Sequence, residues 1–263
     1  MNVNGLMIKV AETVEEVMQA QALRYQVFYD EYGADPIKDM ADVKRDYDSF
    51  DDVSTHLLVI DTNGDNGDEV IGTYRMFMQD VKEEGGSDLH DFYTETEFDI
   101  TKLKKKGNRL MEVGRSCIKD GYRTRFAIQL LWQGIGAFIF AYNVDFLFGC
   151  ASFEGYTDPQ ELAVPLSYLH HHHLAREEIR PTTLPDLYHS IDLMPKEEVN
   201  QKEALKLLPP LVKGYLRLNG VIGDGAMVDN QWNSVDVCIM VESATLSAKH
   251  VEYYRRDRSS PTE

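Results

Sequence analysis

The chain places a glutamate and an arginine inside the apolar stretch Met111-Glu112-Val113-Gly114-Arg115-Ser116-Cys117-Ile118, which otherwise predicts a buried strand. On an alternating strand Glu112 and Gly114 share one face and Arg115 takes the other, so the two charges need separate partners. Arg75 raises the same question in the strand-like run 70–77. Such charges indicate either a structural ion-pair network or a functional site, and the sequence leaves both open.

Working outward, hydrophobic periodicity predicts a mixed α/β sheet flanked by helices. Apolar positions recur at helical spacing over residues 12–32, and a hairpin follows over 56–60 and 70–76. The stretch 111–118 and a turn lead to a long helix over 126–142 and a strand over 145–153. Beyond these we expect a helix from about 159 to 174 and an apolar strand over 235–241.

We expect the chain of 263 residues to comprise a core over 1–175, a polar connector over 176–206 and a C-terminal extension over 207–256 packed on the core. It begins without a basic segment followed by an apolar one, which predicts a cytoplasmic protein. Three widely spaced cysteines, Cys117, Cys150 and Cys238, suit reduced thiols, and none is a convincing nucleophile.

Charge is distributed unevenly along the chain. The formal net charge of -17 argues against nucleic-acid binding, because phosphate backbones repel such a surface. Residues 102–125 nevertheless carry nine basic residues against two acidic ones, a local charge of +7. A second basic group, Lys249, Arg255, Arg256 and Arg258, closes the chain and predicts weak peripheral attraction to an anionic inner membrane. A solvated basic loop is the alternative for both.

The run His170-His171-His172-His173 is predicted to bind no metal. At helical spacing only His170 and His173 share a face, and a metal ion needs at least a third ligand.

Eight motifs together resemble the ornithine N-acyltransferases of bacterial ornithine-lipid synthesis. They are LRYQVF at 23–28, DYD at 46–48, HLLV at 56–59, GTYR at 72–75, EVGRSC at 112–117, LLWQGI at 130–135, LFGCASF at 147–153 and LPPLVKGYLR at 208–217. The resemblance, over residues 10–255, implies a Gcn5-related N-acetyltransferase fold. It also implies transfer of a 3-hydroxy fatty acyl group from acyl carrier protein to the α-amine of ornithine or a similar amino acid.

The first half is also similar to the acyl-homoserine lactone synthases, whose signature positions match Arg24, Phe28, Asp46, Asp48, Arg75, Glu112 and Arg115. The C-terminal third has no counterpart there and favours the ornithine family. A lactone synthase is therefore the same-fold alternative, and a non-catalytic hemolysin-like membrane protein is the alternative of another class. The Arg-x-x-Gly-x-Gly turn that holds the pyrophosphate of coenzyme A is absent around residues 123–129, which suits a carrier-protein donor.

Residue roles follow from this chemistry. Glu112 is the predicted general base for the attacking amine. The acceptor's ammonium and carboxylate groups call for acidic residues and an arginine, which predicts Asp46, Asp48 and Arg75, with Arg115 and Arg24 beside them. The alternative role for Asp46 and Asp48 is capping of a helix or turn. The alternative role for Arg24 is a salt bridge that holds the N-terminal helix to the sheet. Acyl carrier protein is expected to dock on Lys104, Lys105 and Lys106, with Arg123 taking the pantetheine phosphate; no other cofactor is expected.

Overall fold

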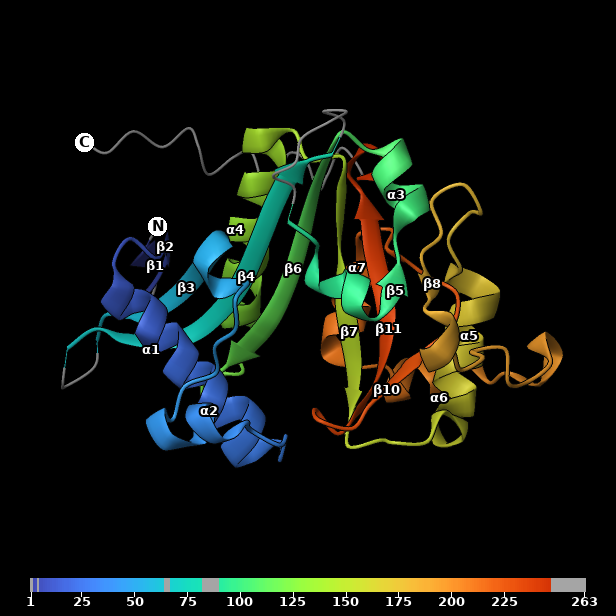
Figure 1. Cartoon of the computed structure of the whole chain (residues 1–263), viewed down its shortest axis with the longest axis horizontal. Helices are drawn as coiled ribbons and strands as arrows, with labels where there is room; N and C mark the ends of the chain where they lie inside the picture. The colour runs from blue at the N-terminus through green and yellow to red at the C-terminus, as the bar shows by residue number, and fades with distance from the viewer. Residues whose placement is uncertain (1, 4, 64–66, 82–89, 247–263) are drawn as a thin grey trace. The chain divides into compact units, whose positions relative to one another are not determined.

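The computed structural model describes residues 2–3, 5–63, 67–81 and 90–246 (Figure 1). The chain forms two compact units, which are described one at a time. The first unit comprises residues 1–77 and 113–143, and the second comprises residues 78–112 and 144–263. Two strands, β4 (Glu69–Asp80) and β6 (Arg109–Ile118), contribute residues to both units.

In the first unit the strands follow the order β1 (Asn2–Val3), β2 (Leu6–Val10), β3 (Thr55–Asp61), β4 and β6. Neighbouring strands from β1 to β4 are antiparallel. The predicted hairpin is confirmed as β3 and β4, with a register shift between Val59 and Ile60. Leu57, Leu58, Val59 and Ile60 are all buried, so β3 is apolar on both faces.

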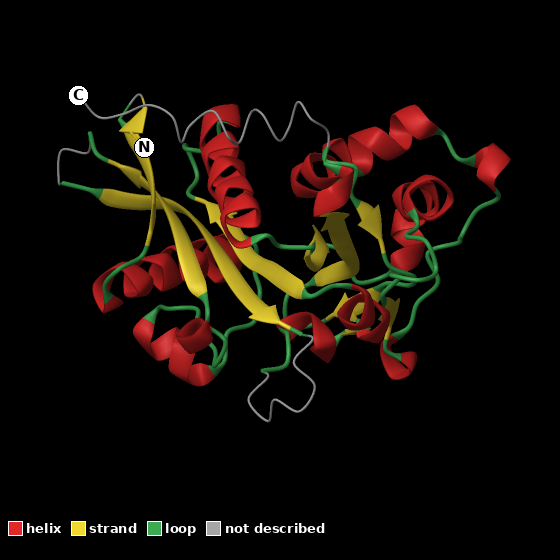
Figure 2. Ribbon diagram, turned by 90° about the horizontal axis from the view of Figure 1, so that it is seen from above, coloured by secondary structure: helices red, strands yellow, loops and turns green. Residues whose placement is uncertain are grey.

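Helices cover both faces of these strands. Figures 1 and 2 show α1 (Val14–Tyr25) and α4 (Arg125–Tyr142) on opposite sides, and a short α2 (Lys38–Val43) follows α1. The side chains of Thr13 and Thr124 cap α1 and α4 by accepting hydrogen bonds from Glu16 N and Ala127 N. The long helix predicted over 126–142 is thereby confirmed.

The predicted helix over 12–32 is correct in extent but not uniform in geometry. After Tyr25 the chain continues as a π-helical segment, Gln26–Glu31. Three consecutive residues, Val27, Phe28 and Tyr29, are buried there. The last turn of α1 likewise buries three consecutive residues, Leu23, Arg24 and Tyr25, so the packed face continues from α1 into the π-helical segment.

Gly134 lets α4 approach the strands closely. A Cβ atom at this position would lie 2.6 Å from Leu57 Cδ2 and 2.7 Å from Ile8 Cδ1. The glycine therefore fixes the distance between α4 and the pair β2 and β3.

In the second unit, residues 110–112 of β6 pair in parallel with β7 (Phe146–Glu154), from Leu110 opposite Phe146 to Glu112 opposite Phe148. β7 then pairs along its whole length with the antiparallel β11 (Ser234–Glu242). β10 (Met227–Asp229) and β9 (Val221–Ile222) pair with β11. The predicted strands over 145–153 and 235–241 are confirmed as β7 and β11.

The helices of the second unit are α3 (Thr101–Lys106), α5 (Ala163–His173), α6 (Gln201–Leu207) and α7 (Pro210–Arg217). β5 (Phe98–Asp99) pairs with β8 (Thr182–Thr183), which joins two segments far apart in the sequence. Short 3-10 turns complete the chain at Asp51–Val53, Tyr93–Thr96, Pro159–Leu162, Pro185–Leu187, Lys196–Glu198 and Ser243–Thr245.

The segment 176–206 predicted as a connector thus contains β8, two 3-10 turns and most of α6. The extension predicted over 207–256 is described only to residue 246, and the basic residues 249–258 lie outside the described residues. The division at residues 175 and 206 stays a prediction. Over the described ranges, no helix has both the length and the apolar character that crossing a bilayer requires.

Candidate functional site

Arg24 lies at the centre of a buried ion-pair cluster in the first unit. Its Nη2 donates to the carbonyl oxygen of Asp46 at 2.6 Å and to Asp51 Oδ2 at 2.7 Å. Its Nε lies 2.8 Å from Asp46 Oδ2. The side chain is 0% exposed, so carboxylates rather than water must compensate its charge. The salt-bridge interpretation of Arg24 is consistent with this geometry, although its partners come from the loop before β3.

Arg75 on β4 and Arg115 on β6 join the same aspartates. Arg75 Nη1 lies 2.5 Å from Asp48 Oδ1 and 3.2 Å from Asp51 Oδ1. Arg115 Nη2 lies 3.1 Å from Asp48 Oδ2, and its Nε lies 3.4 Å from Asp46 Oδ2. Three guanidinium groups therefore meet three carboxylates, and the cluster links α1, β4 and β6 to the loop 46–51.

Asp51 shares in most of these contacts. Besides Arg24 and Arg75, it accepts a hydrogen bond from Gln21 Nε2 at 3.1 Å, and its carbonyl oxygen lies 3.2 Å from His56 Nε2. Burial alone would raise the pKa of Asp51, but Arg24 and then Arg75 outweigh it and lower the pKa to about 2. Burial lowers the pKa of His56, so this imidazole is neutral at pH 7. The pKa of Tyr29 is raised by burial and then by Asp46, whose Oδ1 accepts a hydrogen bond from the Tyr29 hydroxyl at 3.0 Å.

Access divides the cluster into two parts. The side chains of Arg24, Asp46, Asp51 and Arg75 are at most 5% exposed, whereas Asp48 is 23% exposed and Arg115 is 13% exposed. Asp48 and Arg115 are therefore the members of the cluster that solvent reaches most readily. The other members are positioned to hold these two side chains in place.

Arg115 also has an unusual backbone. Its φ angle is +51°, in the left-handed region that non-glycine residues seldom adopt. The prediction of simple alternation along 111–118 is therefore wrong beyond Gly114, because a left-handed residue interrupts the pleat. Residues 110–113 are all buried, and residues 114–116 are partly exposed. Strained residues of this kind occur at functional sites when surrounding contacts hold them, and the aspartates supply such contacts here.

Glu112 is buried in the second unit, where it binds the turn Tyr93–Thr96. Its Oε1 accepts hydrogen bonds from Thr94 N and Thr94 Oγ1, both at 2.6 Å, and its Oε2 accepts from Tyr93 N at 3.0 Å. Phe92 precedes the turn and packs edge-on against Phe148 of β7, with ring centroids 5.0 Å apart. Glu112 is thus an acceptor held in one orientation, which both a base and a structural anchor require.

The predicted donor-binding residues fall in both units. Lys105 and Lys106 are exposed on α3 of the second unit, and neither forms an ion pair within the part of the chain that the structure describes. Lys104 is different, because its Nζ lies 2.8 Å from Glu95 Oε1 and 5.8 Å from the centre of the Phe92 ring. Arg123, in the first unit, pairs with Glu31, and its Nε donates to the Ile118 carbonyl oxygen.

The run 102–125 is therefore less basic in space than in sequence. Several of its members are neutralised by acids from elsewhere in the chain: Lys104 by Glu95, Arg109 by Asp80, Arg115 by Asp46 and Asp48, Lys119 by Glu69, and Arg123 by Glu31. The strongest remaining candidates for contact with an acidic partner are Lys105 and Lys106.

Sequence reasoning missed two features of these sites. It gave Asp51 no role, although its spacing of three residues from Asp48 could have indicated a shared partner. It also missed Glu97, Asp229 and Asp236, whose carboxylate oxygens lie within 4.8 Å of one another. Glu97 and Asp236 are buried. No local pattern could have shown this group, because Glu97 lies more than 130 residues before the two aspartates.

The cysteines are poor nucleophiles, as predicted. Cys117 and Cys238 are buried, and burial raises the pKa of both thiols and of the Cys150 thiol. A thiol kept in its neutral form does not attack a thioester effectively.

Comparison with known proteins identifies the family. The chain is 42% identical over 257 residues to the L-ornithine N(alpha)-acyltransferase of Rhizobium meliloti (strain 1021), which covers 96% of this chain and 85% of the relative. It is 38% identical over 252 residues to the protein of that name from Rhodobacter capsulatus, covering 95% of this chain and 94% of the relative. The chain belongs to the L-ornithine N(alpha)-acyltransferase family.

Two further matches concern the fold. A domain family described as "Acetyltransferase (GNAT) domain" matches residues 23–133. A solved coenzyme A-dependent acyl-homoserine lactone synthase, BjaI with MTA, superposes with a TM-score of 0.50 at 14% identity, covering 98% of this chain and 92% of that one. The predicted Gcn5-related α/β fold is confirmed. The predicted acyltransferase activity is confirmed as well, and neither alternative, the lactone synthase or the non-catalytic membrane protein, describes this family.

Replacing Asp51 by Asn should destabilise the fold in a pH-dependent way. At pH 7 the change leaves Arg24 and Arg75 short of a carboxylate and should cost about 3–5 kcal/mol. The folded pKa, about 2, lies below the unfolded value of 3.8, so the stabilisation is fully present above pH 3.8 and is lost as the pH falls from there through the folded pKa. The difference from wild type, measured by urea unfolding, should therefore shrink by about 1 kcal/mol between pH 7 and pH 3.

Asp52 provides the matched control, since it is the adjacent residue and is exposed. Asp52→Asn should change the unfolding free energy by no more than about 0.5 kcal/mol at either pH. Equal losses for the two variants, or a loss for Asp51→Asn that does not change with pH, would contradict the role given to Asp51.

Proposed function

We propose that this chain transfers a 3-hydroxy fatty acyl group from acyl carrier protein to the α-amine of ornithine, the first step of ornithine-lipid synthesis. The observation that carries the proposal is the match, along almost the whole chain, to relatives named for ornithine α-acylation. The acceptor comes from those names. The proposals for the donor, the residue roles and the cellular location rest on the residues themselves.

The carrier-protein donor is supported by charge. Acyl carrier proteins are acidic, and an acidic partner is attracted even to a net-negative protein if it meets a local basic surface. Lys105 and Lys106 on α3 offer such a surface. Arg123 stays our candidate for the pantetheine phosphate, and its pair with Glu31 would have to open or rearrange to admit the phosphate.

On the acceptor side, ornithine brings one carboxylate and two ammonium groups. We assign its carboxylate to Arg115 and one ammonium to Asp48, because these two side chains reach the surface of the cluster. Arg75, Asp46 and Arg24 act behind them, since each is buried and pairs with a member of the same cluster. Binding would exchange the Arg115–Asp48 contact for two contacts with the substrate.

The chemistry is aminolysis of a thioester. The neutral α-nitrogen attacks the thioester carbon, the carbon–sulfur bond breaks, and an amide and a free pantetheine thiol result. The nitrogen must lose one proton, and the leaving thiolate must gain one. We assign removal of the amine proton to Glu112, directly or through one water, because its carboxylate is buried and held in one orientation.

We place the reaction in the cytoplasm, with the enzyme in peripheral contact with the inner membrane. The product is amphiphilic, so it has to move from the enzyme into a bilayer. The basic residues of the C-terminal segment, which lie outside the described residues, stay our candidate for attraction to anionic lipid.

The Glu112→Gln variant tests the catalytic assignment. A glutamine cannot take a proton, so turnover per folded enzyme should fall by roughly 10²–10⁴-fold. The amide nitrogen must also face one of the three donors on Tyr93 and Thr94, which should lower stability by about 1–3 kcal/mol. Turnover with acyl carrier protein and ornithine, and melting temperature, are measured on the same purified sample.

The Thr94→Val variant separates catalysis from anchoring. It removes the hydroxyl donor to Glu112 but leaves the carboxylate and the backbone donors in place. If Glu112 is the base, Thr94→Val should keep far more activity than Glu112→Gln at similar stability. If turnover falls equally in both variants, in proportion to their folded fractions, Glu112 is not the general base and only anchors the turn Tyr93–Thr96.

Reversing charge at Lys105 and Lys106 tests the donor surface. The double change to Glu should raise the KM for acyl carrier protein by roughly tenfold and flatten its salt dependence, because steering attraction is lost. The KM for ornithine should hold constant. Lys104 is left intact, since its pair with Glu95 would confuse the result.

Lys202 and Lys206 on α6 form the matched control, because both are exposed and their reversal changes net charge by the same amount. That double variant should keep the wild-type KM for acyl carrier protein. An unchanged donor KM in the Lys105 and Lys106 variant, or the same rise in both variants, would remove α3 as the docking surface.

A further inference from the structure

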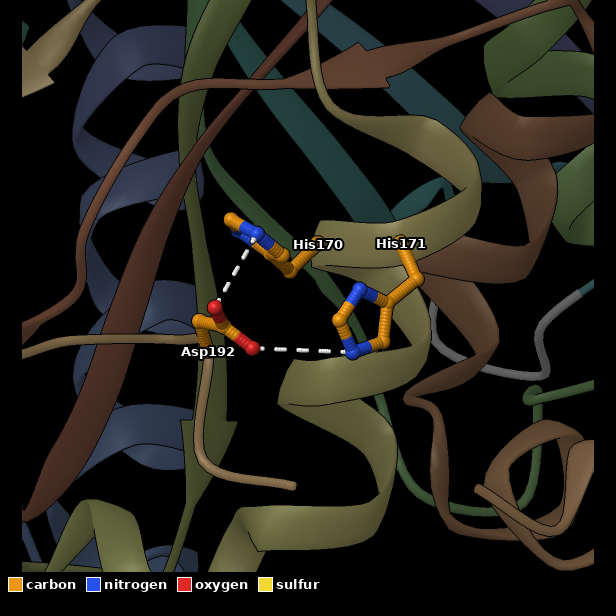
Figure 3. Close-up of side chains that lie close together, drawn as sticks. All are labelled: His170, His171 and Asp192. Atoms are coloured by element: carbon orange, nitrogen blue, oxygen red, sulfur yellow. Dashed lines mark ion pairs between the residues drawn. The ribbon is translucent and has the colours of Figure 1, made fainter. Parts of the chain in front are cut away.

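The four-histidine run divides into two pairs with different surroundings. The rings of His172 and His173 lie 5.0 Å and 5.4 Å from the ring of Tyr168, centre to centre. His170 and His171 instead approach a single carboxylate, that of Asp192 (Figure 3). Helical spacing puts His170 on one face with His173, but the end of α5 turns the adjacent imidazoles of His170 and His171 toward the loop that carries Asp192.

The three side chains converge at distances that suit one metal ion. His170 Nε2 lies 3.7 Å from Asp192 Oδ2, and His171 Nε2 lies 3.5 Å from Asp192 Oδ1. One ligand atom from each of the three residues lies within 4.8 Å of the other two. Ligand bonds of about 2.0–2.1 Å in a tetrahedral site place neighbouring ligand atoms about 3.3 Å apart. Small side-chain movements would bring all three atoms onto a shared ion.

The segment that carries Asp192 is already fixed to α5. Ser167, which is fully buried, accepts hydrogen bonds from Leu193 N at 3.1 Å and Met194 N at 3.0 Å. These contacts hold the Asp192 carboxylate near the histidines before any ion arrives. A site assembled in this way loses little conformational entropy on binding, which favours affinity.

One existing contact sets a limit on affinity. His171 Nε2 also lies 2.8 Å from the carbonyl oxygen of Met194, to which it donates as an N–H group. Coordination through this nitrogen requires its lone pair and so replaces that hydrogen bond. The exchange predicts moderate binding rather than the very tight binding of a preformed site with four protein ligands.

We propose that His170, His171 and Asp192 bind one divalent transition-metal ion of the zinc type, with water completing the coordination. Two imidazoles and a carboxylate suit zinc, cobalt or nickel better than magnesium or calcium, which prefer oxygen ligands. The ion would join α5 to the segment 192–194. Its role is structural, because none of the three residues belongs to the site assigned to acyl transfer.

Zinc and cobalt titrations of the full chain, purified without a metal column and treated with chelator, test the site. Wild type should bind one equivalent with micromolar affinity, and bound cobalt should show the visible absorption of a tetrahedral site. A zinc concentration about a hundred times the Kd should raise the melting temperature by roughly 5 °C. Asp192→Asn should weaken binding at least about tenfold and abolish most of that rise.

The control is His172→Gln with His173→Gln, which removes as many imidazoles from the same helix but leaves the three proposed ligands. This variant should bind zinc as wild type does. The proposal is overturned if wild type binds no zinc at a zinc concentration of about 100 µM. It is also overturned if Asp192→Asn binds zinc as tightly as wild type, or if the control variant loses zinc binding. The last two results would indicate adsorption to a histidine-rich helix.

Discussion

The contact of Asp51 with Arg24 and Arg75 is the constraint on which the first unit depends. One carboxylate joins the N-terminal helix to a central strand, and Asp46 and Asp48 extend the same network to Arg115. Three positive and three negative charges balance there almost out of contact with water. Removing one member leaves another charge buried and unmatched, which costs far more than the loss of an exposed ion pair. The cluster therefore behaves as a unit and sets the position of the loop 46–51.

Strand β6 carries two charged side chains, Glu112 and Arg115, that contact different partners. Glu112 binds the turn Tyr93–Thr96, and Arg115, three residues later, binds Asp46 and Asp48. Alternation along a strand already places residues 112 and 115 on different faces, and the backbone turns left-handed at Arg115 itself. We propose proton transfer at Glu112 and substrate contact at Asp48 and Arg115. The fully buried members of the cluster keep those contacts in place.

Much of this architecture could be predicted from the sequence. The helix α4, the hairpin of β3 and β4, and the strands β7 and β11 have long apolar runs or clear periodicity, so local pattern was sufficient. The prediction that Glu112 and Arg115 need separate partners agrees with the contacts described for each. The features that could not be predicted from the sequence depend on long-range pairing or on unusual turns. Asp51 as the shared partner, the convergence of His170 and His171 on Asp192, the π-helical turn at Gln26–Glu31 and the bend at Arg115 have no periodic signal.

The most direct test of the account is the product made in living cells. The chain would be expressed in a bacterium that makes no ornithine lipid, and the lipid extract would be analysed by tandem mass spectrometry to locate the acyl group. The account predicts a new lyso-ornithine lipid with a 3-hydroxy fatty acyl chain on the α-nitrogen, absent from cells without the gene. An acyl-homoserine lactone, an acyl group on the side-chain nitrogen, or no new product from abundant folded protein would contradict it.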